Sequence, residues 1–340
     1  EACVRSICEQ DYASLDVVVF DDGSTDATPS ILERLCGEFQ HLRVIKGTPL
    51  PDGWVGKVWA CHQLSEAARG DVLIFTDADT HHAPQTVASA VRTLQREKLD
   101  FFSIITHQEL GTLGEHLVIP VVHMLFFSHL PSDLVMHHPS VKASAANGQF
   151  MCFTRQAYTS IGGHSSVRTA MVEDVSLARV LKSARLKIGL LDGIDYVSCR
   201  MYTSAREVTD GFSKNFFAGT NYNVPVMIAL LLFFFCVYVM PYIVLGIGLW
   251  MWETNIALLR SSPSLVLSML SLPFTQILLA MFIRGTISLR FRMPMWHAVV
   301  MPISALWVVY IGLRSMQWAF SSTGTHWKGR SYSRPTTDHA

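Results

Sequence analysis

The sequence predicts an α/β domain followed by apolar helices that cross a membrane. Two short runs, LDVVVF at Leu15–Phe20 and DVLIFT at Asp71–Thr76, are rich in β-branched and aromatic residues and are separated by segments of helical character. Such alternation is typical of a mainly parallel sheet with helices on both faces. Three later segments, 226–252, 261–283 and 293–313, contain no Asp, Glu, Lys or Arg, and each is long enough for a helix to span the hydrocarbon core of a bilayer.

The charged residues divide the chain into two parts. The 340 residues include 27 Lys and Arg and 27 Asp and Glu, only 16% of the chain, and the mean hydropathy is +0.29. Residues 226–340 carry eight basic and two acidic residues, which leaves 19 basic and 25 acidic residues in 1–225. Soluble domains are about a quarter charged. The composition therefore excludes a disordered chain, a small disulfide scaffold and a strongly basic nucleic-acid binder.

The elements of the α/β part follow one another in a regular order. Two of the strand-like runs end in acidic clusters, and ligands of open α/β sheets bind outside the carboxyl ends of the strands. Both clusters are therefore candidate site residues. The sequence predicts helices over 1–10, 29–38, 58–68 and after Pro84, and strands over 15–20, 42–45, 71–76 and 100–106.

The apolar part is predicted to be a multi-pass membrane region over 226–317 with a basic tail over 318–340. Arg284, Arg290 and Arg292 lie between the second and third uncharged segments and favour a cytoplasmic loop there. This orientation places the whole of 1–225 on the cytoplasmic side. Three complete crossings would leave the basic tail outside, so a re-entrant second segment is one alternative. Three buried helices of a soluble core are another.

Three smaller observations bear on the context of the chain. The apolar run Leu117–Leu130 is too short to span a bilayer, and both a helix lying on the membrane and a core helix fit it. Seven cysteines without a C-x-x-C pair fit reduced thiols in the cytoplasm. The chain starts at Glu1, without Met and inside a predicted helix, so we expect an N-terminal piece to be missing.

Asp77 and Asp79 follow the strand 71–76 with one residue between them. Carboxylates this close repel each other, so a cation is their natural partner. Mg²⁺ is commonly held by one or two carboxylates together with substrate phosphates, and we expect Mg²⁺ or Mn²⁺ here. Two alternatives stay open: a polar turn that caps a helix, and an aspartyl-phosphate phosphatase that uses Asp77 as nucleophile and Asp79 as acid.

Asp21 and Asp22 begin the second acidic cluster, DDGSTD, after the strand 15–20. Their carboxylates offer hydrogen-bond acceptors for a base or a ribose, and Gly23 allows a ligand to approach the backbone closely. A solvated turn would have the same residues. The aspartyl-phosphate phosphatase mechanism assigns no role to this cluster. Together, VVVFDDGSTDAT and LIFTDADT resemble the nucleotide-sugar half of the family-2 glycosyltransferases, which have the GT-A fold.

The resemblance extends along the chain. PLPDGWVGKVWACHQL resembles that family's loop with a Lys near the nucleotide, here Lys57, and NGQFMCFTRQAYTSIGGH resembles the acceptor-side strand, which implies acceptor binding by Asn147, Gly148 and Gln149. MVEDVSLARVLK carries the Glu-Asp pair. The stretches 200–219 and 327–332 resemble a membrane-bound subgroup, the carotenoid and hopanoid-associated glycosyltransferases.

Two departures from the family pattern stand out. The first strand of the family, with its nucleotide-contacting segment, is absent from the chain as given. The Q-x-x-R-W motif of processive synthases is also missing, and GFSKN stands in its neighbourhood. The second departure argues against a polysaccharide synthase and makes Lys214 a candidate cation for the leaving diphosphate.

The resemblance implies an inverting transferase that moves a sugar from a nucleotide sugar, a UDP-sugar, to a membrane lipid such as a carotenoid or another isoprenoid. Asp174 is the expected base, and Glu173 is expected to orient it. Two acidic residues that only stabilise a helix N-terminus would give the same sequence pattern. Asp79 is the expected metal ligand, with Asp77 on ribose or metal. The domain is expected over 1–225. A non-catalytic membrane scaffold is the remaining alternative.

Overall fold

The computed structural model describes residues 1–129, 131–254, 261–321, 325–327 and 330–332. The chain forms two compact units, which are described separately: the first comprises Glu1–Glu109 and Ser128–Met201, and the second comprises Leu110–Phe127 and Tyr202–Ala340. Two basic residues of the predicted tail, Lys328 and Arg334, lie outside the described residues.

The first unit alternates helices and strands as the sequence predicts, with boundaries that differ by a few residues. Its helices and turns are α1 (Ala2–Cys8), α2 (Thr28–Glu38), α3 (Gly56–Ala67), α4 (Thr86–Arg96), α6 (Ser132–His137), η1 (Val141–Ala143), α7 (Arg155–Ser160), η2 (Gly163–Val167) and α8 (Glu173–Ser183). Its strands are β1 (Val17–Asp21), β2 (Leu42–Lys46), β3 (Val72–Thr76), β4 (Thr80–His82), β5 (Phe101–Ile105), β6 (His107–Gln108), β7 (Phe150–Thr154), β8 (Ile188–Asp192) and β9 (Val197–Cys199).

The central sheet has the strand order β3-β7-β5-β8 and is mixed, where the sequence predicted a mainly parallel sheet. β7 lies between β3 and β5 and runs antiparallel to both, while β5 and β8 are parallel. β7 and β5 are buried throughout except for Thr154, because both faces of the sheet are covered. A continuous apolar run gives no sign of strand direction, which explains the difference.

Two smaller sheets complete the first unit. β1 and β2 pair in parallel, so that Asp21 lies opposite Lys46. β4, β9 and β6 form a short sheet in which β9 pairs antiparallel with β4 and parallel with β6. β4 follows β3 after only three residues, Asp77–Asp79. The segment that carries both acidic side chains is therefore fixed at each end by a strand.

The second unit is helical. Its helices are α5 (Leu113–His129), α9 (Ala205–Gly219), α10 (Val224–Tyr238), α11 (Met240–Glu253), α13 (Pro263–Val266), the π-helical turn η3 (Leu267–Ser271), α14 (Leu272–Arg290), η4 (Met295–Ala298) and α15 (Met301–Phe320). The strands β10 (Thr325–Trp327) and β11 (Arg330–Tyr332) pair antiparallel.

Two helical stretches in the described residues are long and apolar enough to cross a membrane, Val224–Glu253 and Pro263–Arg290. They include the first predicted segment, 226–252, and residues 263–283 of the second. The third, 293–313, differs from the prediction, because it divides into η4 and the start of α15 and does not add a third such helix. One face of α15 is buried, with Ala305, Val308 and Ile311 at 4% exposure or less.

The boundary between the units also differs from the predicted one at 225. α9 packs against α15: Trp307 Nε1 donates a 3.1 Å hydrogen bond to Thr209 Oγ1, and the Phe217 amide donates a 2.9 Å hydrogen bond to Ser315 Oγ. These contacts place α9 with the C-terminal helices. α5 belongs to the same unit, and its residues Leu117–Ile119 are at most 6% exposed, which favours the core-helix alternative for this part of the run.

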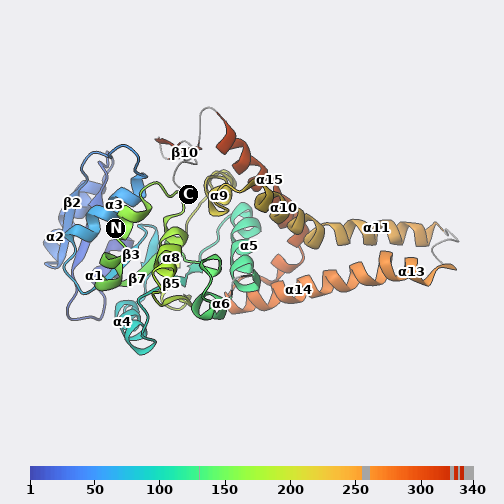
Figure 1. Ribbon diagram of the computed structural model, residues 1–340, viewed down its shortest axis with the longest axis horizontal. Coiled ribbons are helices and arrows are strands. Elements are labelled where there is room, and N and C mark those ends of the chain that lie inside the picture. Colours follow the sequence, from blue (N-terminus) through green and yellow to red (C-terminus); the bar gives the residue numbers. More distant parts are fainter. Residues whose placement is uncertain (130, 255–260, 322–324, 328–329, 333–340) are drawn as a thin grey trace. The chain divides into compact units, whose positions relative to one another are not determined.

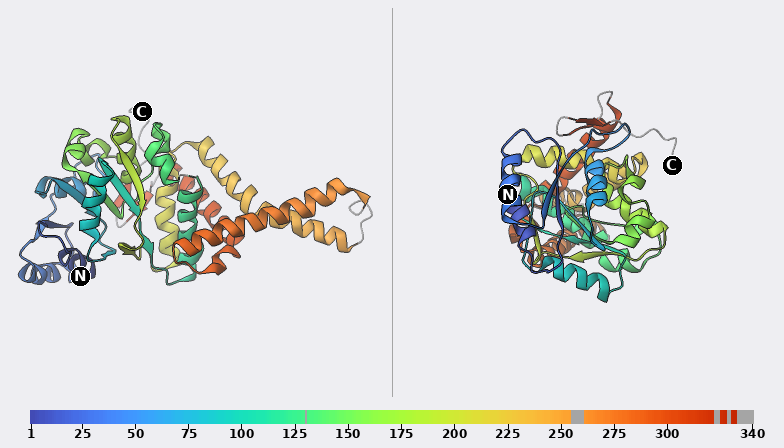
Figure 2. Two further views of the ribbon diagram at one scale, coloured as in Figure 1. Left: turned by 90° about the horizontal axis from the view of Figure 1, so that it is seen from below. Right: turned by 90° about the vertical axis from the view of Figure 1, so that its left-hand side faces the viewer.

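The two apolar stretches pack together as a hairpin, in which α11 and α14 run side by side (Figures 1 and 2). Gly248 marks the close approach: a Cβ there would lie 2.6 Å from the Met269 carbonyl oxygen. Pro273 has no N–H to close an α-helical bond to that carbonyl, and the π-helical turn η3 precedes it. Glycine is therefore required where the two backbones meet.

Candidate active site

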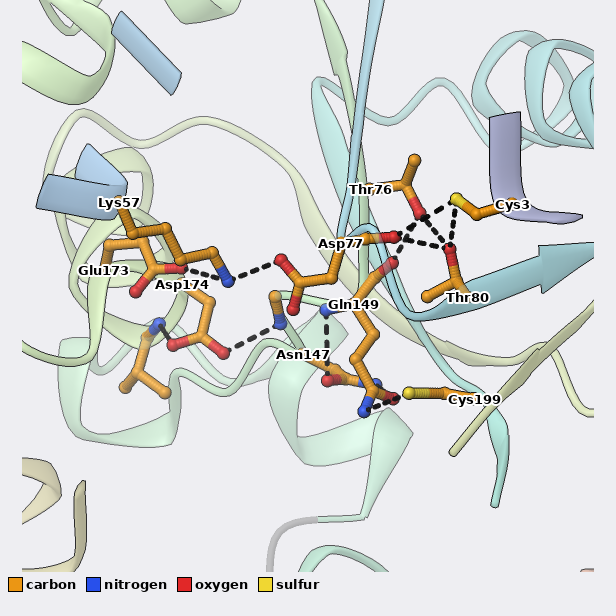
Figure 3. Close-up of polar contacts among 12 residues, drawn as sticks. Cys3, Lys57, Thr76, Asp77, Thr80, Asn147, Gln149, Glu173, Asp174 and Cys199 are labelled. Carbon is orange, nitrogen blue, oxygen red and sulfur yellow. Dashed lines mark hydrogen bonds and ion pairs between the residues drawn. The ribbon is translucent and has the colours of Figure 1, made fainter. Parts of the chain in front are cut away.

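A single ammonium group joins two of the acidic segments in the first unit (Figure 3). Lys57, in the first turn of α3, has its Nζ 2.7 Å from Asp77 Oδ1 and 2.8 Å from Glu173 Oε1. Burial opposes the charged form of Lys57, but Glu173 and then Asp77 outweigh it and hold the pKa of Lys57 well above its usual value. The structure thus places Lys57 between Asp77, which follows β3, and Glu173, which begins α8.

Glu173 is ionised in this arrangement. Its side chain is only 8% exposed, and burial alone would favour the protonated form. The attraction of Lys57 prevails and holds the pKa of Glu173 below its usual value. A buried carboxylate needs such a partner, because an unpaired charge in a protein interior is strongly destabilising.

Asp174 lies next to this ion pair and is held by two backbone amides. Its Oδ2 accepts a 2.8 Å hydrogen bond from Gly148 N, and its Oδ1 accepts a 2.8 Å hydrogen bond from Val175 N. Burial and then the negative charge of Glu173 raise the pKa of Asp174 to about 7, against the opposing effects of Lys57 and the two amides. A carboxyl group with a pKa near neutrality is suited to exchange a proton during catalysis.

Gly148 lies where these charged groups converge. A Cβ at this position would be 3.2 Å from Lys57 Nζ, 3.3 Å from Glu173 Oε1 and 3.4 Å from Asp174 Oδ2. The distances to Lys57 and Glu173 are tighter than most contacts that a Cβ makes, so a larger residue here would require at least one of these charged groups to move. The glycine therefore allows the loop before β7 to pack closely against the first turn of α8.

The neighbouring residues Asn147 and Gln149 bind other parts of the protein. Asn147 Nδ2 donates to the Ile104 carbonyl at 2.9 Å. Gln149 is 5% exposed. Its Oε1 accepts from Thr106 Oγ1 and from Gln108 Nε2, and its Nε2 donates to Cys199 Sγ. These bonds fix the loop before β7, and the predicted contact of both residues with an acceptor stays a prediction.

Asp77 and Asp79 offer two hard oxygen donors to a metal ion. Burial, followed by the negative charge of Asp77, raises the pKa of Asp79. A cation at this position would relieve both effects. In the described part of the chain no group of three or more His, Cys, Asp and Glu side chains is placed to hold a metal ion. The two carboxylates therefore fit an ion whose remaining ligands come from donor phosphates and water, which is how Mg²⁺ is usually held.

The other predicted residues belong to other elements of the chain. Asp21 ends β1, and its Oδ1 accepts a 2.9 Å hydrogen bond from Ser24 N, which lowers the pKa of Asp21. Asp22 follows and is exposed. Lys214 is on α9 in the second unit. The roles of all three toward a nucleotide sugar stay predictions.

Sequence reasoning did not single out the residues around Asp79. A pocket of about 260 Å³ opens there, and Glu109, Ser198 and Arg200 are among the residues that line it. One signal was present, because Arg200 opens the stretch 200–219 that resembles the membrane-bound subgroup, but nothing in its spacing points to Asp79.

Part of the chain is similar in sequence to known proteins. Residues 1–158 match the model of glycosyl transferase family 2. A 4,4'-diaponeurosporenoate glycosyltransferase of Staphylococcus haemolyticus (strain JCSC1435) is 24% identical over 239 residues, which cover 67% of this chain and 60% of the relative. Its counterpart from Staphylococcus aureus (strain USA300) is 27% identical over 243 residues, 68% of this chain and 61% of the relative. The chain spans about three fifths of the length of these curated relatives.

A solved structure has a similar fold. The mannosyltransferase from Pyrobaculum calidifontis, in complex with GDP-Man and Mn²⁺, aligns over 94% of this chain and 83% of its own, with a TM-score of 0.52 and 19% sequence identity. At this identity the likeness shows the fold alone, which is GT-A. Residues 1–158 are therefore similar to glycosyl transferase family 2, and the chain has the GT-A fold.

Proposed function

We propose that this protein transfers a sugar from a nucleotide sugar, a UDP-sugar, to a membrane lipid, with inversion at the anomeric carbon. The observation that carries the proposal is the placement of Asp174, whose carboxyl group is held by two amides beside the Lys57–Glu173 pair. That pair reaches Asp77 in the D-x-D segment. A group that can accept a proton is thus connected to a segment that can hold a donor.

The proposed reaction is a single displacement. An acceptor hydroxyl attacks the anomeric carbon, the bond from that carbon to the diphosphate oxygen breaks, and the bonding pair leaves with the nucleoside diphosphate. Asp174 takes the hydroxyl proton, and its pKa of about 7 leaves much of it ionised at neutral pH. Gly148 N and Val175 N hold the carboxylate in place.

Mg²⁺ or Mn²⁺, held by Asp79 and Asp77, would supply positive charge to the leaving diphosphate. The chain's own contribution is to keep the two carboxylates ordered. β3 and β4 fix the segment from both ends, and Lys57 restrains Asp77. Asp21 and Asp22 are proposed to contact the nucleoside, as the family resemblance implies.

A lipid acceptor is supported by the two apolar helical stretches, Val224–Glu253 and Pro263–Arg290. The curated relatives are named for 4,4'-diaponeurosporenoate, and we extend a carotenoid or other isoprenoid acceptor to this chain. We further propose that the protein is a multi-pass membrane protein with its catalytic domain in the cytoplasm. Two results would support this topology. The full-length protein should resist alkaline extraction from membranes, and protease should digest the first unit only after the cells are opened.

The direct test uses membranes that contain the full-length protein, a lipid extract, a divalent cation and radiolabelled UDP-glucose, with GDP-mannose as a second donor. Transfer of label into lipid is expected with one of them. The absence of label with a full panel of nucleotide sugars would contradict the proposal. Metal-dependent hydrolysis of an aryl phosphate, lost in Asp77→Asn, would instead favour the phosphatase alternative. A scaffold would bind no nucleoside diphosphate.

A further inference from the structure

The amide side chain of Gln149 is buried, at 5% exposure, and both of its polar ends are bound within the first unit. Its Oε1 accepts hydrogen bonds from Thr106 Oγ1 and, at 2.9 Å, from Gln108 Nε2. With the oxygen held in this way, Nε2 points to Cys199 and donates a 3.2 Å hydrogen bond to its Sγ (Figure 3). The orientation of the Gln149 amide is therefore set by the protein itself.

Cys199 lies between Gln149 and Asp79. It ends β9 and pairs with Thr80, the residue that follows Asp79. Cys199 and Asp79 both line the pocket of about 260 Å³. Burial and then the negative charge of Asp77 raise the pKa of Asp79, whereas a hydrogen bond with the Cys199 thiol acts in the opposite direction. A thiol can accept one hydrogen bond and donate another, so Cys199 can connect the amide to the proposed metal ligand.

The backbone beside Gln149 is tied to two other parts of the site. The Gln149 carbonyl accepts a 2.9 Å hydrogen bond from Thr76 Oγ1, and Thr76 directly precedes Asp77 (Figure 3). One residue earlier, Gly148 N donates to the carboxylate of Asp174, the proposed base. Residues 148 and 149 therefore contact the base, the end of β3 and the thiol next to the D-x-D segment.

We propose that Gln149, acting through Cys199, is a positioning residue that fixes the Asp79 carboxylate relative to the base Asp174. The proposal rests on the proposed glycosyl transfer. In a single displacement the attacking and leaving oxygens lie on opposite sides of the anomeric carbon, so the base and the metal ligand must keep a fixed separation. The family resemblance implied contact of Gln149 with the acceptor. The buried amide, bound at both ends by the protein, supports the positioning role instead.

The test measures binding and does not depend on turnover. Binding of UDP, and in a parallel series of GDP, to the full-length protein in detergent is measured by calorimetry, with Mn²⁺ and with a chelator. Cys199→Ala should weaken binding in Mn²⁺ by about tenfold or more, as loss of a partner of a metal ligand does. Binding in the chelator should change by less than about twofold. Cys199→Ser keeps a donor and an acceptor and should recover part of the loss.

A second variant tests whether Gln149 acts through the thiol. Gln149→Met has a similar shape and lacks the amide, and it should weaken binding in Mn²⁺ in the same direction as Cys199→Ala. Because the two side chains form one chain of contacts, the double variant should lose no more than the larger of the two single losses. Losses that multiply in the double variant would show that Gln149 acts on its own, and would overturn the proposal.

Cys152→Ala is the matched control, because Cys152 in β7 is another fully buried thiol. It should bind nucleotide in Mn²⁺ as the wild type does. A rise in the acceptor KM of Gln149→Met, with unchanged nucleotide binding in Mn²⁺, would indicate acceptor contact and overturn the positioning role.

Three further outcomes are also decisive. Unchanged binding in Cys199→Ala would overturn the inference and leave the proposed transfer intact. If Gln149→Met does not fold, the comparison of Cys199→Ala with Cys199→Ser decides, since equal losses in both would exclude a hydrogen-bonding role. A wild-type protein that binds no nucleotide in Mn²⁺ would refute the proposed function itself.

Discussion

The amide of Gly148 donates a 2.8 Å hydrogen bond to the carboxylate of Asp174, which lies 26 positions later in the chain. The bond joins the loop before β7 to the first turn of α8. It fixes the orientation of a carboxyl group whose pKa is raised to about 7 by burial and by the negative charge of Glu173.

Asp174→Asn tests the proposed base. The amide cannot take a proton, so sugar transfer to a hydroxyl acceptor should fall by about 10²–10⁴-fold, while UDP binding by calorimetry stays within about twofold, since Asp174 is outside the D-x-D segment. Asp174→Glu is the charge-conserving comparison. Full turnover in Asp174→Asn would remove the base role and would indicate an acceptor that brings no proton, such as a carboxylate.

The pH dependence of transfer should show the influence of Glu173. The base works when ionised, so kcat/KM should rise with pH through about 7 in the wild type. The negative charge of Glu173 raises the pKa of Asp174, so Glu173→Gln should move this rise to lower pH, by about one unit. Glu66→Gln is the control, because Glu66 is 67% exposed and contacts His62 instead. A rise that stays near 7 in Glu173→Gln would exclude the electrostatic coupling.

Removal of divalent cations should abolish transfer, and Mn²⁺ or Mg²⁺ should restore it. Asp79→Asn removes a charged oxygen ligand, so it should raise the cation concentration needed for half-maximal rate by roughly tenfold or more. Asp133→Asn, an exposed acidic residue in the first turn of α6, should leave that concentration unchanged. Full activity in a chelator would contradict the proposed metal role.

Gly148→Ala should reduce transfer by roughly tenfold or more, because small displacements of catalytic groups are costly. The new methyl group would press on Lys57, Glu173 and Asp174. The matched control is Gly37→Ala in α2, where a Cβ meets nothing within 4 Å. That change should stabilise the protein by about 0.5–1 kcal/mol through helix propensity and leave transfer unchanged. Equal activity of both variants would show that Gly148 is not a steric requirement.

Two glycines of α11 should respond with opposite signs. Gly248→Ala drives a Cβ against the Met269 carbonyl and should destabilise the second unit by about 1–3 kcal/mol. Gly246→Ala meets nothing within 4 Å and should be neutral or stabilising by about 0.5–1 kcal/mol. Thermal unfolding in one detergent compares them. The same midpoint for both variants would mean that α11 and η3 do not pack at Gly248.

Much of the first unit could be predicted from the sequence because its signals are local. The strands β1 and β3 are apolar runs that end in acidic clusters, and Asp77 and Asp79 stand out by spacing alone. The direction of β7 could not be predicted, since an apolar run buried on both faces has the same composition in a parallel or an antiparallel place. The third apolar segment was also misjudged: composition does not reveal that α15 buries one face and begins only at residue 301.

The candidate site shows the same limit at the level of side chains. The Glu173-Asp174 pair is visible in the sequence, but its partner Lys57 lies more than a hundred positions earlier. No periodicity connects them, and only the folded sheet brings α3 and α8 together. The same holds for Cys199, whose place opposite Thr80 depends on the register between β4 and β9.

That register has a consequence for the order of folding. Thr80 and Cys199, which face each other in the short sheet, are separated by more than a hundred residues. Closing so long a loop costs conformational entropy that only the assembled unit can offset. During synthesis, a nascent chain that ends before β9 has Asp77 and Asp79 but lacks the strand that pairs with β4. We therefore expect the short sheet beside Asp79 to form late, only after β9 has left the ribosome and joined β4.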